Sequence, residues 1–218
     1  MNVVSQDAIE TLTRELAADP DNVGLLHARG RAWHRLADNE RAIADYDRAV
    51  TLGLQSAALH NDRGVAWWHR GSDARALEGF NAALELDPDH PLALINRGDL
   101  YEKRGDLTRA ATDFERVIDV QTAVLQERPH DLAALTMRGA AANRAGRLDD
   151  ALLDLNRAAE LPNPTTKVFR HRGEILLKRG RAAAALADFD RCLKSDPHNP
   201  IVQSLRDSAT AALENKAE

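Results

Sequence analysis

The side chains in this sequence most able to support chemistry are eight histidines and one cysteine. Two or more histidines can bind a metal ion only when they lie within reach of the same ion. His27 and His34 are seven residues apart, which on a helix separates them by about 10 Å along the axis, too far to share one. No paired metal-ligand spacing links His60, His69, His90, His130, His171 and His198. We therefore predict surface or groove histidines, with no metal site and no cofactor.

Cys192 is the only cysteine, so the chain cannot form an internal disulfide, which fits a reducing compartment. It occupies a position that is a small residue elsewhere in the sequence, which favours a packing role over a nucleophilic one. The sequence also contains no phosphate-binding loop and no nucleophile elbow. We predict that the protein is not an enzyme and has no catalytic residues.

Five arginines that directly precede a glycine recur at intervals of 34 or 41 residues: Arg29, Arg63, Arg97, Arg138 and Arg172. Four of these five are followed sixteen residues later by an aspartate. The planar guanidinium of arginine can hold a carboxylate through two bonds, so the spacing predicts structural ion pairs. The expected pairs are Arg29–Asp45, Arg97–Asp113, Arg138–Asp154 and Arg172–Asp188. Arg63 has Gly79 at the aspartate position and is therefore the best candidate for an unpaired, ligand-facing guanidinium. A stripe of five arginines for anionic ligands is the alternative interpretation.

These arginines belong to a repeat. The glycines Gly30, Gly64, Gly98, Gly139 and Gly173 are separated by 34, 34, 41 and 34 residues. Twelve residues after each glycine stands an alanine, and sixteen after it a large apolar residue, in the series Tyr46, Phe80, Phe114, Leu155 and Phe189. Seven residues after each glycine comes a turn position, which holds Ala37, Gly71, Gly105, Gly146 and Gly180. Self-similarity at this period is typical of helical repeat arrays.

The columns resemble the tetratricopeptide repeat. They share its small residue inside a first helix, its alanine and aromatic residue in a second helix, and its closing Asp-Pro, as in Asp87-Pro88 and Asp196-Pro197. The first full unit ends differently, with Gly53-Leu54, and the resemblance covers about residues 7 to 199. It implies an all-α fold, a right-handed solenoid of stacked helix-turn-helix hairpins.

The apolar spacing independently predicts two helices per unit, each hairpin too small to bury its apolar face without a neighbour. Gly64 then marks a helix crossing too close for a side chain. We expect a single domain over residues 1–218 with twelve helices. Its parts are a leading helix (7–22), repeats at 23–56, 57–90, 91–131, 132–165 and 166–199, and a C-terminal capping helix (200–216).

The ends of the array have amphipathic patterns that suit capping helices. In the leading helix, Ala8, Leu12 and Leu16 share one face. The closing helix has Asn199 as its expected N-cap and a stripe of Ile201, Leu205, Ala209 and Leu213.

The third repeat is seven residues longer than the others. Seven residues are about two helical turns, so the apolar face returns nearly in phase. The spacing predicts one long helix from about Leu107 to Glu127. The extension is either a tolerated length variant or a protruding helix end that touches a partner or a second subunit.

In the tetratricopeptide family the first helix of each unit lines an inner groove, and the resemblance places a peptide-binding groove on the matching positions. Trp68 falls about 100° round the helix from Trp67, toward this groove, where it is either a binding hot spot or half-covered by the next helix. The expected groove residues are His27, Arg31, His34, Asn61, Arg63, Val65, Trp68, Ile95, Asp99, Glu102, Thr136, Ala140, Asn143, Arg170, Glu174 and Leu177.

Charge and composition narrow the partners. The chain has 34 acidic and 29 basic residues, and this acidic balance argues against a nucleic-acid partner. It has no apolar run long enough to span a membrane, and its first residues do not resemble a signal peptide, so we expect a cytoplasmic protein. The groove begins with His27 and Arg31 and ends near Arg144, Lys167, Arg170 and Lys178. That distribution favours a protein or peptide segment with an acidic portion.

The sequence therefore predicts a non-enzymatic scaffold whose concave groove holds a partner segment. One alternative is a structural protein that self-associates into a homo-oligomer through the long third-repeat helix or the terminal helices. Another is a regulatory lobe for a separately encoded enzyme. The fold alone does not choose among them, because the same scaffold serves many partners.

Overall fold

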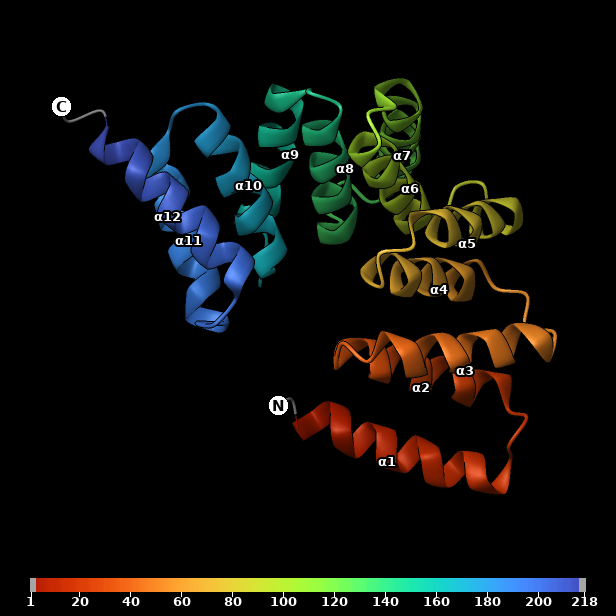
Figure 1. The fold of residues 1–218 in the computed structure, drawn as a ribbon. Helices are drawn as coiled ribbons and strands as arrows, with labels where there is room; N and C mark the ends of the chain where they lie inside the picture. The colour runs from red at the N-terminus through yellow and green to blue at the C-terminus, as the bar shows by residue number, and fades with distance from the viewer. Residues whose placement is uncertain (1–2, 216–218) are drawn as a thin grey trace. The chain divides into compact units, whose positions relative to one another are not determined.

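The computed structural model describes residues 3–215, and within them the chain forms twelve helices and no strands (Figure 1). The chain divides into two compact units, Met1–Asp113 and Phe114–Glu218. The helices are α1 (Val3–Ala18), α2 (Val23–Arg35), α3 (Asn39–Thr51), α4 (Ala57–His69), α5 (Asp73–Leu86), α6 (Pro91–Lys103), α7 (Leu107–Glu127), α8 (Leu132–Arg144), α9 (Leu148–Glu160), α10 (Thr166–Lys178), α11 (Ala182–Ser195) and α12 (Pro200–Glu214).

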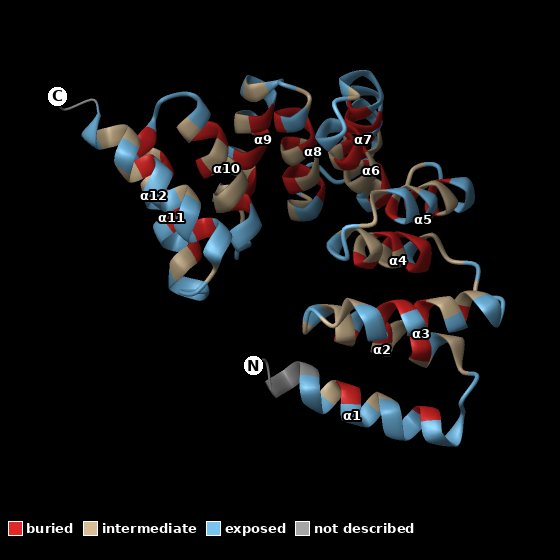
Figure 2. Cartoon of the chain, in the orientation of Figure 1, coloured by how far each residue is buried: buried red, intermediate tan, exposed pale blue. Residues whose placement is uncertain are grey.

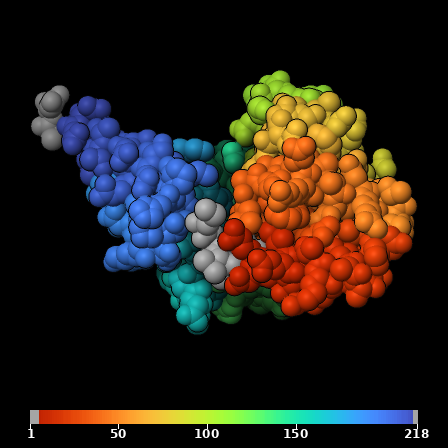
Figure 3. All heavy atoms as spheres, turned by 60° about the horizontal axis from the view of Figure 1, so that its bottom comes forward, coloured from red at the N-terminus to blue at the C-terminus, as the bar shows by residue number. Residues whose placement is uncertain are grey.

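Within each unit, helices that follow one another in the chain pack side by side. In the first unit α2 packs on α3 and α4 on α5, and the first helices of successive hairpins also touch, α2 against α4 and α4 against α6. In the second unit α8 packs on α9, α10 on α11 and α11 on α12, and α10 also contacts α8. Buried positions lie on the helix faces that meet these neighbours (Figure 2). On the face shown in Figure 3, the red to yellow residues of the first unit form one continuous surface.

The turn inside each hairpin is set by one residue with a left-handed backbone. Gly71, Gly105 and Gly146 each have φ of 78°, and Gly180 has 68°. In the first hairpin the same position is Ala37, with φ of 61°, a conformation that an alanine side chain disfavours. All residues at this turn position therefore adopt the same left-handed backbone conformation, and in Ala37 that conformation is strained.

The small-residue column marks the crossing of the two helices in a hairpin. A Cβ atom at Gly64 would lie 2.8 Å from the ring of Phe80 and 3.0 Å from the carbonyl oxygen of Ala76. Gly30, Gly139 and Gly173 face Tyr46, Leu155 and Phe189 in the same way. The large apolar residue of the second helix therefore packs directly onto the glycine of the first.

The second hairpin has an additional close approach. A Cβ atom at Gly79 would lie 2.7 Å from the Cα atom of Gly64 and 2.9 Å from the carbonyl oxygen of His60. Gly79 occupies the aspartate column, so the break in that column has a packing reason: the backbones of α4 and α5 come too close at this point for any side chain.

The long helix α7 spans Leu107–Glu127, as the sequence predicts. Its extension does not protrude as an apolar surface, because Val117, Ile118 and Leu125 are buried, with exposed fractions of 0%, 6% and 7%. The hypothesis that the end of this helix touches a partner or a second subunit stays a prediction.

The capping helices differ in detail from their expected faces. Among the α1 side chains that the structure describes, residues 6–18, the buried ones are Ile9 and Leu16, and Ile9 is not part of the predicted stripe. The side chain of Asn199 accepts a hydrogen bond from the Val202 amide at 3.2 Å and so caps α12 as expected. The prediction for Ile201 is wrong: it is 62% exposed, while Val202, one residue further round the helix, is buried.

Candidate binding site

The four predicted arginine–aspartate pairs are formed. In each, the guanidinium donates from Nε and Nη2 to the two carboxylate oxygens over 2.7–2.8 Å. The aspartates lie inside the hairpin, and the side chains of Asp113 and Asp154 are each only 4% exposed. These hydrogen bonds, opposed by burial, raise the pKa of the arginines, so the pairs stay ionised. The buried carboxylates are thereby paired and hydrogen-bonded, as buried charges must be.

Each paired arginine also reaches back to the helix that precedes its own hairpin. Its Nη1 donates to an uncharged side chain sixteen residues earlier in the chain. These acceptors are Thr13 at 3.4 Å for Arg29, Asn81 at 2.9 Å for Arg97, Thr122 at 3.1 Å for Arg138 and Asn156 at 3.2 Å for Arg172. The arginine column thus links successive second helices through one guanidinium.

Arg63 is not unpaired, contrary to the prediction. Its Nε lies 2.6 Å from Oδ1 of Asp47, in an ion pair whose geometry is too bent for a hydrogen bond. Asp47 lies sixteen residues before Arg63, at the position that is uncharged for the other four arginines. Arg206 on α12 likewise pairs with Asp190, sixteen residues earlier, at 2.8 Å. In both pairs the aspartate precedes the arginine, so counting forward from the arginine does not predict them.

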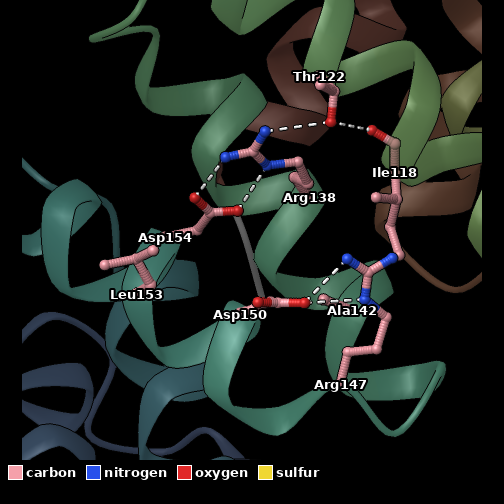
Figure 4. Close-up of a pocket in the computed structure, with 8 residues that line it drawn as sticks. All are labelled: Ile118, Thr122, Arg138, Ala142, Arg147, Asp150, Leu153 and Asp154. Atoms are coloured by element: carbon pink, nitrogen blue, oxygen red, sulfur yellow. Dashed lines mark hydrogen bonds and ion pairs between the residues drawn. The ribbon is translucent and has the colours of Figure 1, made fainter.

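A pocket of about 190 Å³ between α7, α8 and α9 shows this column at close range (Figure 4). Arg138 directs its nitrogens at Asp154 and Thr122, and the Thr122 hydroxyl donates to the carbonyl oxygen of Ile118 at 2.7 Å. Arg147 on the pocket rim bonds to Asp150. The charged groups of this pocket are therefore directed at one another, which disfavours the stripe of arginines for anionic ligands.

On the first helices of the first unit, several predicted groove residues bond across neighbouring helices. Nε2 of His27 lies 3.0 Å from Oδ2 of Asp62, and Nε of Arg31 lies 3.6 Å from the same oxygen. Asn96 donates from its amide nitrogen to Oδ1 of Asn61 at 2.8 Å, and Asn61 is buried. Asp62 therefore balances Arg31 and contacts His27 at the start of the groove, and Asn61 serves helix packing.

The two adjacent tryptophans are both half-buried but pack differently. The ring of Trp67 stacks beneath the guanidinium of Arg75, whose Cζ is 4.2 Å from the ring centre. Trp68 meets Phe80 edge to face, with ring centres 6.2 Å apart. Phe80 belongs to the second helix of the same hairpin, so Trp68 is held in place by its own repeat and keeps part of its surface exposed.

On the second unit, the corresponding helices α8 and α10 are joined by Lys178, which donates to Oδ1 of Asn143 at 2.9 Å. Glu174 accepts from Arg170 at 3.1 Å and lies 3.6 Å from Nδ1 of His171. Burial raises the pKa of Glu174, but the hydrogen bond from His171 and the nearby arginines outweigh it and lower the pKa overall. Glu174 is therefore ionised and balances Arg170.

A pocket of about 360 Å³ lies beside this face, between α10, α11 and the start of α12. Lys167 and Arg170 line it together with Asp196, Asn199 and the exposed Ile201. Cys192 also lines it; its thiol donates to the carbonyl oxygen of Thr166 at 3.3 Å, and burial raises its pKa. A thiol held in this protonated state is a poor nucleophile, consistent with a packing role.

Of the remaining predicted residues, Val65, Ile95, Asp99 and Ala140 are half-buried, Glu102 is exposed and Thr136 is buried. His60, expected at a surface or in a groove, is buried instead, with 7% exposure. In the described part of the chain, no three histidine, cysteine, aspartate or glutamate side chains come together as metal ligands. No helix there is both long and apolar enough to cross a membrane.

Helical hairpins that pack in chain order within each unit, with glycine crossings and linked second helices, define a helical repeat protein. Family models described as tetratricopeptide repeat match residues 5–56, 35–91, 74–121 and 95–164, and a second such model matches residues 171–199. The chain belongs to the tetratricopeptide repeat family. Repeats of this family generally mediate protein–protein interactions, and the fold is typically a non-enzymatic scaffold.

Known proteins resemble the chain at low identity. The human mitochondrial import receptor subunit TOM70 is 28% identical over 95 residues, which are 44% of this chain and 15% of the receptor. The chain thus matches only a small part of that relative's length. Among solved structures, the APC/C hetero-tetramer Cut9–Hcn1 has a TM-score of 0.70 at 18% identity, covering 94% of this chain and 39% of the other.

Two further solved structures also share the fold. A thermophilic tetratricopeptide repeat protein from Thermus thermophilus has a TM-score of 0.66 at 20% identity, covering 88% of this chain and 98% of the other. A tetratricopeptide repeat protein from Parabacteroides merdae has a TM-score of 0.56 at 19% identity, covering 94% and 92%. At these identities the likeness concerns the fold alone.

Proposed function

We propose that this protein is a non-enzymatic binding module that holds a segment of a partner protein against the first helices of its repeats, in the cytoplasm. The observation that supports it best is Trp68, a large aromatic side chain fixed by Phe80 yet still partly exposed. Binding hot spots are enriched in tryptophan because a rigid, amphipathic ring contributes much contact area at little conformational cost.

The experiment compares partner capture from native lysate by the unmodified protein and by Trp68→Ala. We expect the variant to fold, because Trp68 is only half-buried, and to lose most of the captured protein. Leu153→Ala is the matched control, since Leu153 is a 60% exposed apolar residue on the second helix α9. Equal capture by the unmodified protein and Trp68→Ala, with both folded by circular dichroism, would contradict the proposal that the partner binds the first helices of the first unit.

We further propose that an acidic portion of the partner binds beside Lys167 and Lys178. Arg170 is balanced by Glu174, whereas Lys167 is exposed and Lys178 bonds to the uncharged Asn143, which leaves an excess of positive charge. Charge reversal at Lys167 and Lys178 should weaken capture and reduce its dependence on salt. If the double variant captures the partner as strongly as the unmodified protein and with the same salt dependence, the proposed binding of an acidic portion beside Lys167 and Lys178 is wrong.

A further inference from the structure

Two histidines that are distant in sequence lie together on the first unit. His34 is in the last turn of α2 and His69 ends α4, one repeat further along the chain. Their ring centres are 5.1 Å apart and the ring planes meet at 70°. They are 35 residues apart, so a search for ligand pairs within one helix does not find them.

The ring of His34 is oriented by a neighbour. Its Nδ1 lies 2.7 Å from Oδ1 of Asn39, and the amide nitrogen of Asn39 donates to the carbonyl oxygen of Ala37 at 3.4 Å. The amide oxygen therefore faces the imidazole, and Nδ1 of His34 must be the protonated nitrogen. Nε2 then keeps its lone pair. A hydrogen bond from one ring nitrogen that leaves the other free is the arrangement found around metal-binding histidines.

The spacing of the two rings suits one ion between them. A Zn²⁺–N bond of about 2.1 Å places each ring centre roughly 3.2 Å from the ion, so a tetrahedral angle separates the ring centres by about 5.2 Å. The observed 5.1 Å agrees with this value. His27 cannot act in the same way, because its Nε2 is directed at Asp62.

The two histidines are open to solvent, and a neighbouring cation is paired. His69 is exposed and His34 is half-buried, so water can complete the coordination. Arg70, the residue after His69, lies 3.2 Å from Glu40, and this pairing reduces its repulsion of a cation. Imidazole nitrogens favour Zn²⁺, Ni²⁺ and Cu²⁺, whereas Mg²⁺ and Ca²⁺ require oxygen ligands.

We propose that His34 and His69 form a two-histidine site for a borderline divalent transition metal ion, with Asn39 orienting His34 and water filling the open positions. This metal site goes beyond the proposed function, and its test needs no partner protein. It lies on the same first helices as Trp68.

The test is calorimetric titration of the tag-free full chain, first stripped with chelator, with ZnCl₂ and separately with NiCl₂. We expect one ion per chain. His34→Ala and His69→Ala should each weaken binding at least tenfold, and Asn39→Ala should weaken it less, since outer partners tune affinity. The control His130→Ala removes an exposed histidine between α7 and α8 and should leave binding unchanged, and MgCl₂ should produce no binding.

The proposal is overturned by an unmodified chain that takes up no Zn²⁺ or Ni²⁺ at millimolar concentration, or by uptake that persists in both histidine variants. Loss in only one variant would also overturn it, because the ion would then not be shared. His69→Asn is a second variant at this exposed position, in case His69→Ala does not fold, and it should also weaken binding. Imidazole nitrogen chemical shifts provide a second readout, and metal should move the signals of His34 and His69 together.

Discussion

Arg97 bonds to side chains sixteen residues away in both directions, to Asp113 on α7 and to Asn81 on α5. The carboxylate partner of Arg97 comes later in the sequence and its uncharged partner comes earlier. For Arg63 the order is reversed, because Gly79 stands at the later position and Asp47 at the earlier one. Each arginine of the column therefore has one carboxylate in reach, and the position of that carboxylate changes where the backbone leaves no room for it.

This one-carboxylate arrangement predicts a rescue. Asp113→Asn should lower the free energy of unfolding by about 3 kcal/mol, because it leaves the Arg97 guanidinium without its buried counter-ion. Adding Asn81→Asp places a carboxylate behind Arg97, as Asp47 stands behind Arg63, and should recover about 1 kcal/mol. Urea denaturation of the three variants measures both changes. No recovery in the double variant would mean that the two positions are not interchangeable.

The crossing of α4 and α5 predicts an unusually costly glycine substitution. Gly79→Ala places a Cβ atom 2.7 Å from the Cα atom of Gly64, and a backbone cannot yield as a side chain can. We expect a loss of about 2 kcal/mol or more, even though alanine is the better helix former. Gly24→Ala is the control: its Cβ atom would meet only the Asn22 side chain at 3.4 Å, so the variant should be neutral or stabilised. Similar effects at both sites would contradict the close crossing.

The sequence predicted the features that depend on local spacing, because the spacing of residues along a helix decides which face of the helix each side chain lies on. The long helix α7 and the pairing of Arg138 with Asp154 followed from such counts. The partner of Arg63 has the same sixteen-residue spacing but precedes the arginine, so a forward count does not find it. The contact of His34 with His69 joins adjacent hairpins, whose register only the packed structure defines. Ile201 was misplaced because apolar spacing alone did not fix which face of α12 meets α11.

The strained turn at Ala37 predicts a stabilising substitution. Ala37→Gly removes the Cβ atom from a residue with φ of 61°, a relief of about 1–2 kcal/mol per residue that exceeds the extra unfolded-state entropy of glycine. We expect a net gain of about 0.5–1 kcal/mol in thermal or urea denaturation. The opposite sign is expected for Ala74→Gly, an exposed position inside α5, which should cost about 1 kcal/mol. A loss of stability in Ala37→Gly would show that the turn is not strained.

The buried histidine of α4 predicts how stability depends on pH. Burial, and then the nearby Arg63, lower the pKa of His60 below its ordinary value of 6.5, and its Nδ1 has no hydrogen-bond partner. As the pH falls below 6.5, the unfolded chain binds a proton at this residue that the folded chain resists, so His60 reduces the free energy of unfolding until the pH passes its folded pKa. His60→Leu removes this penalty, and its advantage over the unmodified protein should widen between about pH 7 and pH 5 in urea denaturation. A constant stability difference between His60→Leu and the unmodified protein across this pH range would mean that His60 is protonated equally in both states.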